Sequence, residues 1–336
     1  MSSDRLQVGV IGVGNIGHAH ARALAATVAG SEVVAVYDFD AARAAAVADE
    51  LGARAVGSPA ELIEASQAVV ISSPDALHAE QALQCLAAGR PTLCEKPLAP
   101  VLADARAVLD AEVALGRRLI TMGFMRRFDE GYVQLKARVD AGVAGQPLLV
   151  NCTHRNADVY AEQTSKHTIT NSVVHEIDIN RWLLSDEYAS VQVISGRPSP
   201  HVQGPDLRDP LIVLLRTRSD VLVQVQAFMH ARYGYDVRCE LVGSEATLAM
   251  GNGDYIDVAR DGRVGVDVAP QWLGRFGEAY RREMQAWVDA TRAGVVTGPT
   301  TWDGFVASSV AADCITALNE NGPVAVRLPD RPSLYA

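Results

Sequence analysis

The sequence predicts an α/β fold: a doubly wound parallel sheet at the N-terminus, followed by an α+β domain with a large, mostly antiparallel open sheet. Three observations support this prediction. Short apolar runs alternate with Ala-rich helical stretches over the first third of the 336 residues. A glycine-rich segment, residues 12–17, separates the first run from the first helical stretch. Beyond residue 123, several runs alternate apolar with polar residues, which is the pattern of half-buried strands.

The apolar runs of the first third are expected to form parallel strands, because they are nearly continuously apolar and are separated by helical stretches. They comprise residues 8–11, 33–37, 68–72, 92–94 and 119–121. The helical stretches comprise residues 16–29, 41–51, 77–88 and 102–115. Residues 1–123 are therefore expected to form one domain.

The remainder, residues 124–336, is expected to form an α+β domain. Its β-rich segments are residues 147–153, 191–195, 211–217, 221–228 and 237–242. Its expected helices are residues 172–184, 272–293 and 304–318. Arg218, Ser219 and Asp220 form a turn-like segment between two of the strands, which favours an antiparallel hairpin.

Composition disfavours several classes of protein. The 30 basic and 40 acidic residues give a formal charge of −10 and a pI near 5.3, which argues against nucleic acid or an anionic membrane as partner. No apolar run approaches the roughly 20 residues of a transmembrane helix, and the N-terminus lacks the pattern of a signal peptide. The five cysteines contain no CxxC pair. We therefore expect no disulfides, no structural zinc and a cytoplasmic location.

Residues 12–17, Gly-Val-Gly-Asn-Ile-Gly, match the GxGxxG pattern between a strand and a helix. In this pattern Gly12 allows a tight turn, Gly14 lets the backbone approach a pyrophosphate, and Gly17 lets helix and strand pack closely. The helix N-terminus offers N–H groups to the phosphates. Asp38 follows the second strand, 21 residues after Gly17, where a carboxylate accepts hydrogen bonds from ribose hydroxyls and repels a 2′-phosphate. The segment predicts a Rossmann domain that binds NAD rather than NADP.

The carboxyl ends of the parallel strands are expected to lie along one edge of the sheet, where ligands of such folds bind. Lys96 follows one strand and would stabilise the alkoxide that develops when an alcohol is oxidised. Of the two other lysines, Lys136 has with Tyr132 the spacing of a short-chain dehydrogenase pair, but their segment is expected to be an ordinary helix; Lys166 has no expected role. The residues expected to bind the cofactor are Gly12, Gly14, Asn15, Ile16, Gly17, Asp38, Ser72, Ser73, Pro74, His78, Glu95 and Lys96.

Asn171, His175 and Asp178 are expected on one face of a helix, because four and three residues separate them. Asn171 is the expected N-cap of that helix. A neutral histidine suits removal of an alcohol proton, so His175 is the candidate general base. No metal site is expected, because the spacing of His154, His167 and His175 supports none and the helix lacks the zinc-protease pattern.

Several motifs together resemble the Gfo/Idh/MocA family of oxidoreductases. They are the glycine-rich segment, Cys-Glu-Lys-Pro at residues 94–97 and Val-His-Glu-Ile-Asp at residues 174–178. Residues 123–129, 154–156, 233–236 and 298–304 are similar to the inositol dehydrogenases of that family, so the resemblance covers nearly the whole chain. It implies NAD-dependent oxidation of a cyclitol alcohol, most directly myo-inositol to 2-keto-myo-inositol (scyllo-inosose). It also implies a cis peptide at Lys96-Pro97 and a homo-oligomer, a tetramer or a dimer, formed through the open sheet.

The resemblance also implies roles for individual residues. Lys96 and His175 fall on the catalytic lysine and histidine of the family. Arg126, Asn156 and Tyr235 fall on or near its substrate contacts. The expected substrate-binding residues are therefore Lys96, Arg126, Asn156, Asn171, His175 and Tyr235.

Asn171 departs from the family pattern, which has a catalytic aspartate four residues before the histidine. An amide still hydrogen-bonds through its carbonyl, but it brings no charge to raise the pKa of the histidine. Asn171 stays in the expected catalytic set with Lys96 and His175, and it leaves two alternatives open. One is a dehydrogenase of another inositol isomer, a pyranose sugar or an aminocyclitol-pathway polyol. The other is a non-catalytic NAD-binding sensor.

Overall fold

A computed structural model describes residues 5–159, 162–202, 204–251, 257–260 and 262–336. The chain falls into two compact units. The first runs through Met125 and includes Ala279–Ser308 and Pro329–Ala336; the second comprises Arg126–Glu278 and Ser309–Leu328. The division into domains at residues 123 and 124 stays a prediction. None of the helices in the described ranges is long and apolar enough to cross a membrane.

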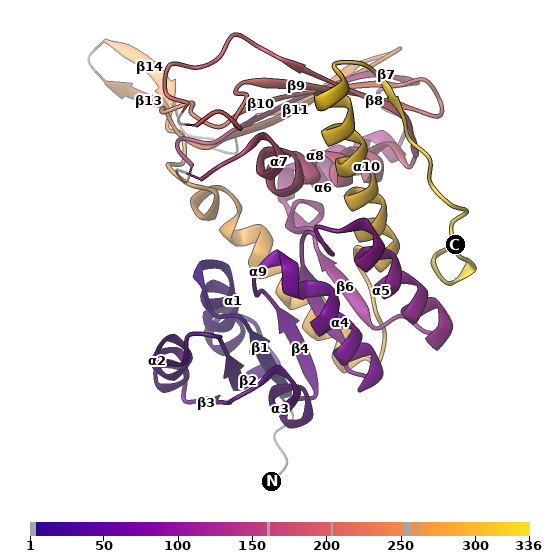
Figure 1. The fold of residues 1–336 in the computed structure, drawn as a ribbon. Coiled ribbons are helices and arrows are strands. Elements are labelled where there is room, and N and C mark those ends of the chain that lie inside the picture. The colour runs from indigo at the N-terminus through magenta and orange to yellow at the C-terminus, as the bar shows by residue number, and fades with distance from the viewer. Residues whose placement is uncertain (1–4, 160–161, 203, 252–256, 261) are drawn as a thin grey trace. The chain divides into compact units, whose positions relative to one another are not determined.

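The first unit contains a six-stranded parallel sheet in the order β3-β2-β1-β4-β5-β6, which confirms the predicted doubly wound fold (Figure 1). The direction of winding reverses between β1 and β4, where ligands of such sheets bind. The strands are β1 (Leu6–Ile11), β2 (Ser31–Tyr37), β3 (Arg54–Ala55), β4 (Ala68–Ile71), β5 (Thr92–Glu95) and β6 (Ile120–Gly123). The helices between them are α1 (Asn15–Ala26), α2 (Ala41–Leu51), α3 (Pro59–Ala65), α4 (His78–Ala87) and α5 (Leu102–Leu115).

Helices cover both faces of this sheet. Alternate residues of β1 point to opposite faces, so the strand packs against helices on each side. On one face, Val10 joins an apolar cluster that includes residues of α1 and Trp287 of α9 (Trp272–Arg292). On the other face, a Cβ built on Gly9 would lie 2.4 Å from a methyl carbon of Leu62 in α3. Burial on both sides explains why the strands are nearly continuously apolar.

Two elements of the first unit, β3 and α3, were not predicted from the sequence. β3 is an exposed two-residue edge strand, so no apolar run marks it. α3, in contrast, carries a readable signal. The side chain of Ser58 accepts the N–H of Glu61 at 3.2 Å, and Pro59 occupies the first helical position. Ser-Pro-x-Glu is a common start of a helix.

The second unit contains a seven-stranded sheet in the order β12-β11-β7-β10-β9-β8-β15. All its pairings are antiparallel except that of β7 with β10, which confirms the predicted mostly antiparallel sheet. The predicted hairpin is β9–β10, and Asp220 in its turn has φ +74°. The strands are β7 (Pro147–Arg155), β8 (Tyr188–Ser195), β9 (Leu211–Thr217), β10 (Leu222–Phe228), β11 (Asp236–Gly243), β12 (Thr247–Met250) and β15 (Val324–Ala325). A separate pair consists of β13 (Asp257–Arg260) and β14 (Arg263–Val266).

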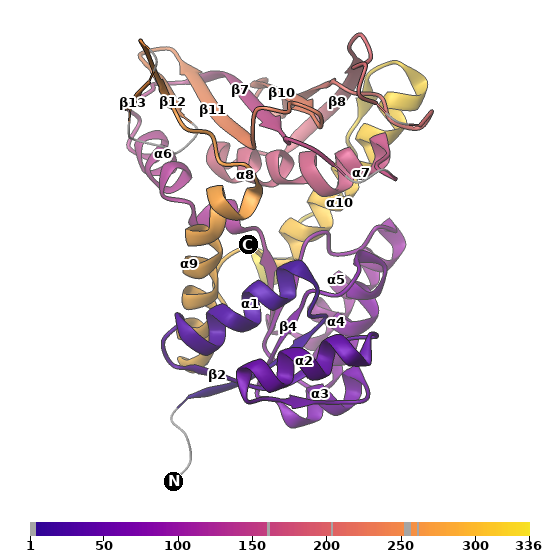
Figure 2. The ribbon, with the colours of Figure 1, turned by 90° about the vertical axis from the view of Figure 1, so that its left-hand side faces the viewer.

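Helices α6 (Glu130–Asp140), α7 (Ser165–His167) and α8 (Val174–Leu184) lie along one face of the seven-stranded sheet (Figure 2). The last long helix is α10 (Thr301–Glu320). Residues of β10 that point to the opposite face are only half-buried, whereas the alternate residues are fully buried. The sheet therefore presents one packed face and one open face.

Candidate active site

The glycine-rich loop joins β1 to α1, and close backbone contacts require glycine at two of its three glycine positions. Gly12 has φ +83°, and a Cβ there would lie 2.5 Å from the backbone of Ser73. A Cβ at Gly17 would lie 1.8 Å from the carbonyl oxygen of Gly12. Gly14 instead faces open space, because a Cβ there would meet no atom within 4 Å, and no side chain caps the N-terminus of α1. This tight turn and open helix N-terminus fit a pyrophosphate.

Asp38 follows β2 and is fixed by main-chain groups. Its Oδ2 accepts the N–H of Val13 at 2.9 Å, and its Oδ1 accepts the N–H of Asp40 at 3.0 Å. Arg43, at the start of α2, places Nη1 3.4 Å from Oδ1. Asp38 thus lies beside the glycine-rich loop, as a ribose-binding carboxylate requires. Arg43 was not among the predicted residues, because it lies five residues beyond Asp38 in the following helix.

Ser72 and His78 connect the loops at the ends of neighbouring strands. Ser72 donates its hydroxyl to the carbonyl oxygen of Gly12 at 2.8 Å. The ring of His78 lies between two carbonyl oxygens, 2.7 Å from that of Pro97 and 2.8 Å from that of Ser73. These residues order the loops around the predicted site. Their direct contact with a cofactor stays a prediction, as it does for Asn15, Ile16, Ser73 and Pro74.

Lys96 is half-buried at the end of β5, and its peptide bond to Pro97 is cis, as the resemblance implied. The preceding residue, Glu95, is buried and lies 2.7 Å from the ring of His20. Its other oxygen accepts the N–H of Lys96 at 3.2 Å. Burial raises the pKa of Glu95, but the hydrogen bond to His20 and the charges of His20 and Lys96 outweigh burial and hold this pKa below its ordinary value.

The predicted N-cap at Asn171 is wrong. The helix begins after Thr164, whose side chain accepts the N–H of His167 at 3.2 Å. A π-helical segment, Thr168–Val173, then continues into α8, and the N–H of Val174 bonds five residues back. Asn171 therefore lies inside a continuous helix. The sequence did not reveal that Asn171 is no cap, because a wider π turn lets the helix continue past this residue.

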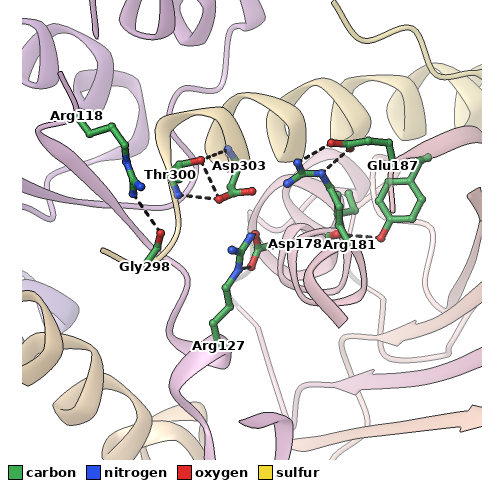
Figure 3. A network of polar contacts seen from close by, with 10 residues as sticks. Arg118, Arg127, Asp178, Arg181, Glu187, Gly298, Thr300 and Asp303 are labelled. Carbon is green, nitrogen blue, oxygen red and sulfur yellow. Dashed lines mark hydrogen bonds and ion pairs between the residues drawn. The ribbon is translucent and has the colours of Figure 1, made fainter. Parts of the chain in front are cut away.

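His175 and Asn171 lie on consecutive turns of this continuous helix. His175 is 6% exposed, whereas Asn171 is exposed. Asp178, the third polar residue of the predicted face, is paired with the guanidinium of Arg127, whose Nε lies 2.9 Å from the carboxylate (Figure 3). Asp178 thus holds the helix against the residues that precede α6, which leaves His175 as the candidate base.

Arg126 and Tyr235, both predicted substrate contacts, lie in one buried cluster. Arg126 forms an ion pair with Glu176 and places Nη2 3.1 Å from His154, and its guanidinium lies 5.4 Å from the centre of the Phe276 ring. The ring of Tyr235 meets that of His154 edge-on at 5.8 Å. Burial raises the pKa of Glu176, but the charges of Arg126 and His154 hold it below its ordinary value. No role for Glu176 was predicted from the sequence, because its partners are distant in the chain.

Asn156 follows β7, and its main chain bonds to Phe228 and Ala231. Its side-chain Oδ1 is buried, and no group in the described part of the chain donates to it. A buried acceptor without a donor is costly. The role of Asn156 as a substrate contact stays a prediction.

The resemblance of Tyr132 and Lys136 to a short-chain dehydrogenase pair is coincidental, as predicted. Both lie in α6, an ordinary helix. Tyr132 is fully buried, and the amine of Lys136 pairs with Asp140 and lies 3.3 Å from the hydroxyl of Ser185. Lys136 therefore lies within a helix, whereas Lys96 lies at a strand end.

The parallel sheet, the glycine-rich loop and Asp38 define a dinucleotide-binding protein of the Rossmann class. Comparison with known families is more specific. A family model described as an oxidoreductase family with an NAD-binding Rossmann fold matches residues 6–124. The model of the C-terminal α/β domain of the same family matches residues 136–326. The chain belongs to the Gfo/Idh/MocA oxidoreductase family, and its cofactor is NAD.

Similar proteins extend over the whole chain. Inositol 2-dehydrogenase 1 of Saccharopolyspora erythraea is 45% identical over 334 residues, which are 98% of this chain and 99% of that protein. Inositol 2-dehydrogenase of Pseudomonas fluorescens is 42% identical, with the same coverage. The crystal structure of myo-inositol dehydrogenase from Lactobacillus casei, in complex with NAD(H) and myo-inositol, matches with a TM-score of 0.95 and 33% identity. It covers 99% of this chain and 100% of its own.

Proposed function

We propose that the protein is an NAD-dependent dehydrogenase of a cyclitol alcohol, most directly one that oxidises myo-inositol to 2-keto-myo-inositol (scyllo-inosose). The observation that carries the proposal is the match, at a TM-score of 0.95, to a structure solved with NAD(H) and myo-inositol. The proposal assigns the chemistry to Lys96, which follows β5, and to His175, which lies in α8.

The glycine-rich loop and the N-terminus of α1 hold the pyrophosphate of the cofactor, and Asp38 holds the adenosine ribose. Main-chain N–H groups at the open end of α1 supply donors and a favourable dipole. NAD, when bound, supplies the hydride acceptor. His78, Ser72 and Ser73 keep the loops after β4 and β5 in place around it.

Lys96 and His175 divide the proton chemistry of the alcohol between them. The imidazole of His175 removes the hydroxyl proton as general base. The ammonium group of Lys96 hydrogen-bonds the same oxygen and stabilises the negative charge that develops there. Asn171 binds a substrate hydroxyl near His175 without adding charge.

Asn156, Arg126 and Tyr235 bind the remaining hydroxyls of the ring. The Oδ1 of Asn156 and the Nε–H of Arg126 support this role, because both are buried and make no hydrogen bond within the described part of the chain. One offers an acceptor and the other a donor, and a polyol satisfies both. The buried cluster with Glu176 and His154 fixes the position of Arg126.

Reduction of NAD+ with a panel of inositols and sugars tests the proposal. We expect the highest kcat/KM with myo-inositol. Asn171, an exposed residue, favours one alternative, a dehydrogenase of another polyol. Its amide replaces the carboxylate of the family and so changes the contact offered to a substrate hydroxyl near the base. Higher kcat/KM for another isomer, a pyranose or an aminocyclitol-pathway polyol would establish that alternative. NAD+ binding without turnover of any member would refute a dehydrogenase and favour a sensor.

We also propose that the enzyme is a homo-oligomer, a tetramer or a dimer, that works in the cytoplasm. The open face of the seven-stranded sheet supports a second copy as partner, because apolar residues such as Leu214 and Phe228 are only half-buried there. The five cysteines are free and buried, which suits a reducing compartment. Light scattering should give at least twice the chain mass of 35.8 kDa, and a monomeric mass would contradict the oligomer.

A further inference from the structure

We propose that His20 and Glu95 form a positioning pair for Lys96: the carboxylate holds the main chain of Lys96 and stabilises the charged form of its amine. This inference rests on the proposed function, in which the Lys96 ammonium acts on the substrate oxygen. It adds a positioning role for both residues, which is separate from the predicted contact of Glu95 with the cofactor.

The pair connects the helix of the glycine-rich loop to the end of β5. His20 lies on α1 and Glu95 is the last residue of β5, so 75 residues separate them. His20 is 1% exposed and Glu95 4%. One carboxylate oxygen lies 2.7 Å from His20 Nε2, and the other accepts the N–H of Lys96 at 3.2 Å. A single carboxylate therefore fixes the main chain from which the Lys96 side chain extends.

Packing leaves the pair little freedom to move. The ring of Tyr280 lies 5.4 Å from that of His20, with a tilt of 59°. On the other side, a Cβ built on Gly123 would lie 3.1 Å from Glu95 Oε2. A larger residue at the end of β6 would push the carboxylate away from Lys96. Glycine at this position thus keeps room for the pair.

The charges around Glu95 favour its ionised form. Burial raises the pKa of Glu95, but the hydrogen bond to His20 and the electrostatic interactions with His20, Lys96 and His78 lower it below its ordinary value. Burial, followed by the interactions with Glu95, Cys85 and Asp75, raises the pKa of the neighbouring Cys94 thiol. An interaction between two charges is mutual, so an ammonium that stabilises the Glu95 carboxylate is stabilised by it to the same extent. The pair therefore keeps Lys96 able to donate a hydrogen bond up to a higher pH.

The scarcity of lysine makes this property directly measurable. The chain has three lysines, so NMR of protein labelled with ¹³C at lysine Cε gives three signals, and K96R identifies that of Lys96. We expect E95Q to lower the pH at which Lys96 titrates by about one pH unit. H20N should shift it in the same direction, because the Glu95 carboxylate loses the hydrogen bond that fixes it beside Lys96.

E112Q provides a matched control. Glu112 is also a buried carboxylate of the first unit that accepts main-chain N–H groups, those of Leu119 at 2.6 Å and Ile120 at 2.8 Å. It is not among the groups that act on Glu95. E112Q should lower the melting temperature and leave the Lys96 titration unchanged. A merely structural Glu95 would behave in the same way as Glu112.

The activity of the variants gives a second readout. E95Q should lower kcat and move the alkaline limb of the kcat profile to lower pH along with the Lys96 titration. An unchanged Lys96 titration in E95Q overturns the proposal, and H20N decides in the same way if E95Q does not fold. The NMR measurement uses the apoprotein, so a wild type that oxidises no polyol refutes the proposed function alone.

Discussion

Replacement of Asp38 by serine should shift cofactor preference from NAD+ toward NADP+. In the wild type the Asp38 carboxylate is fixed by two main-chain N–H groups and repels a 2′-phosphate. Arg43 already lies 3.4 Å from that carboxylate. D38S removes the repulsion and leaves the guanidinium beside the position that a 2′-phosphate would occupy.

The substitution has two effects, a lower affinity for NAD+ and a higher affinity for NADP+, and the size of each can be worked out separately. Loss of a hydrogen bond to a charged group costs roughly 1.5–3 kcal/mol. At about 1.4 kcal/mol per tenfold, NAD+ should bind D38S about 10- to 150-fold more weakly. The Arg43 side chain is 41% exposed, so its attraction for a phosphate is limited to about 1 kcal/mol, or roughly fivefold in Kd. Most of the gain for NADP+ thus comes from the lost repulsion.

Titration of the apoprotein with NAD+ and NADP+ measures both constants. D38N is the matched control, because it keeps an acceptor for the N–H of Val13 but removes the charge. R43A in the D38S background isolates the contribution of the arginine. The reasoning is wrong if D38S keeps wild-type affinity for NAD+, or if D38S/R43A binds NADP+ as tightly as D38S.

Three other substitutions test the second unit. H175A should lower kcat by roughly 10²- to 10⁴-fold, the usual value of a positioned base, and near-full turnover would remove His175 from the mechanism. N171D adds an anion near the base, so the acid limb of the pH–rate profile should move to higher pH; an identical profile excludes Asn171 from the acid–base chemistry. E176Q leaves Arg126 buried without its counter-charge and should cost about 3–5 kcal/mol in denaturant unfolding. Because the pKa of Glu176 is lowered in the fold, its stabilisation is present above the ordinary value of 4.5 and is lost as pH falls below it, so the wild-type advantage over E176Q should shrink in acid; an equal advantage at all pH values would contradict this.

Local signals in the sequence were sufficient for the strand ends of the first unit, although the helix start at Ser58 was missed. The glycine spacing, the aspartate after the second strand and the lysine after β5 each depend on one strand end, and strand ends of a parallel sheet share an edge. The side-chain pairs that escaped prediction depend on tertiary contacts. His20 contacts Glu95 although 75 residues separate them, and no local pattern near either residue predicts the contact.

The second unit shows a different limit. Its strands β7 to β11 and its hairpin follow from the apolar and alternating patterns, whereas β12 to β15 and the start of the helix that carries His175 do not. Asn171 has the composition of a cap, and a residue of that kind is normally a helix start. The π-helical segment overrides this preference, because two of its residues, Ile169 and Val173, are fully buried and keep the segment helical through Asn171.

The π-helical segment takes up one extra residue without changing the direction of His175. A π turn holds one more residue than the α turn that it replaces, and each residue of an α-helix advances the direction of the side chains by about 100°. Deletion of a single residue between Thr168 and Val173 would let a regular α turn form, and the end anchored by Thr164 would keep its direction relative to His175. The same deletion in the regular helix α8 would rotate the side chains on either side of it by about 100°. A one-residue deletion is therefore tolerated better in the π-helical segment than in the helix that follows it.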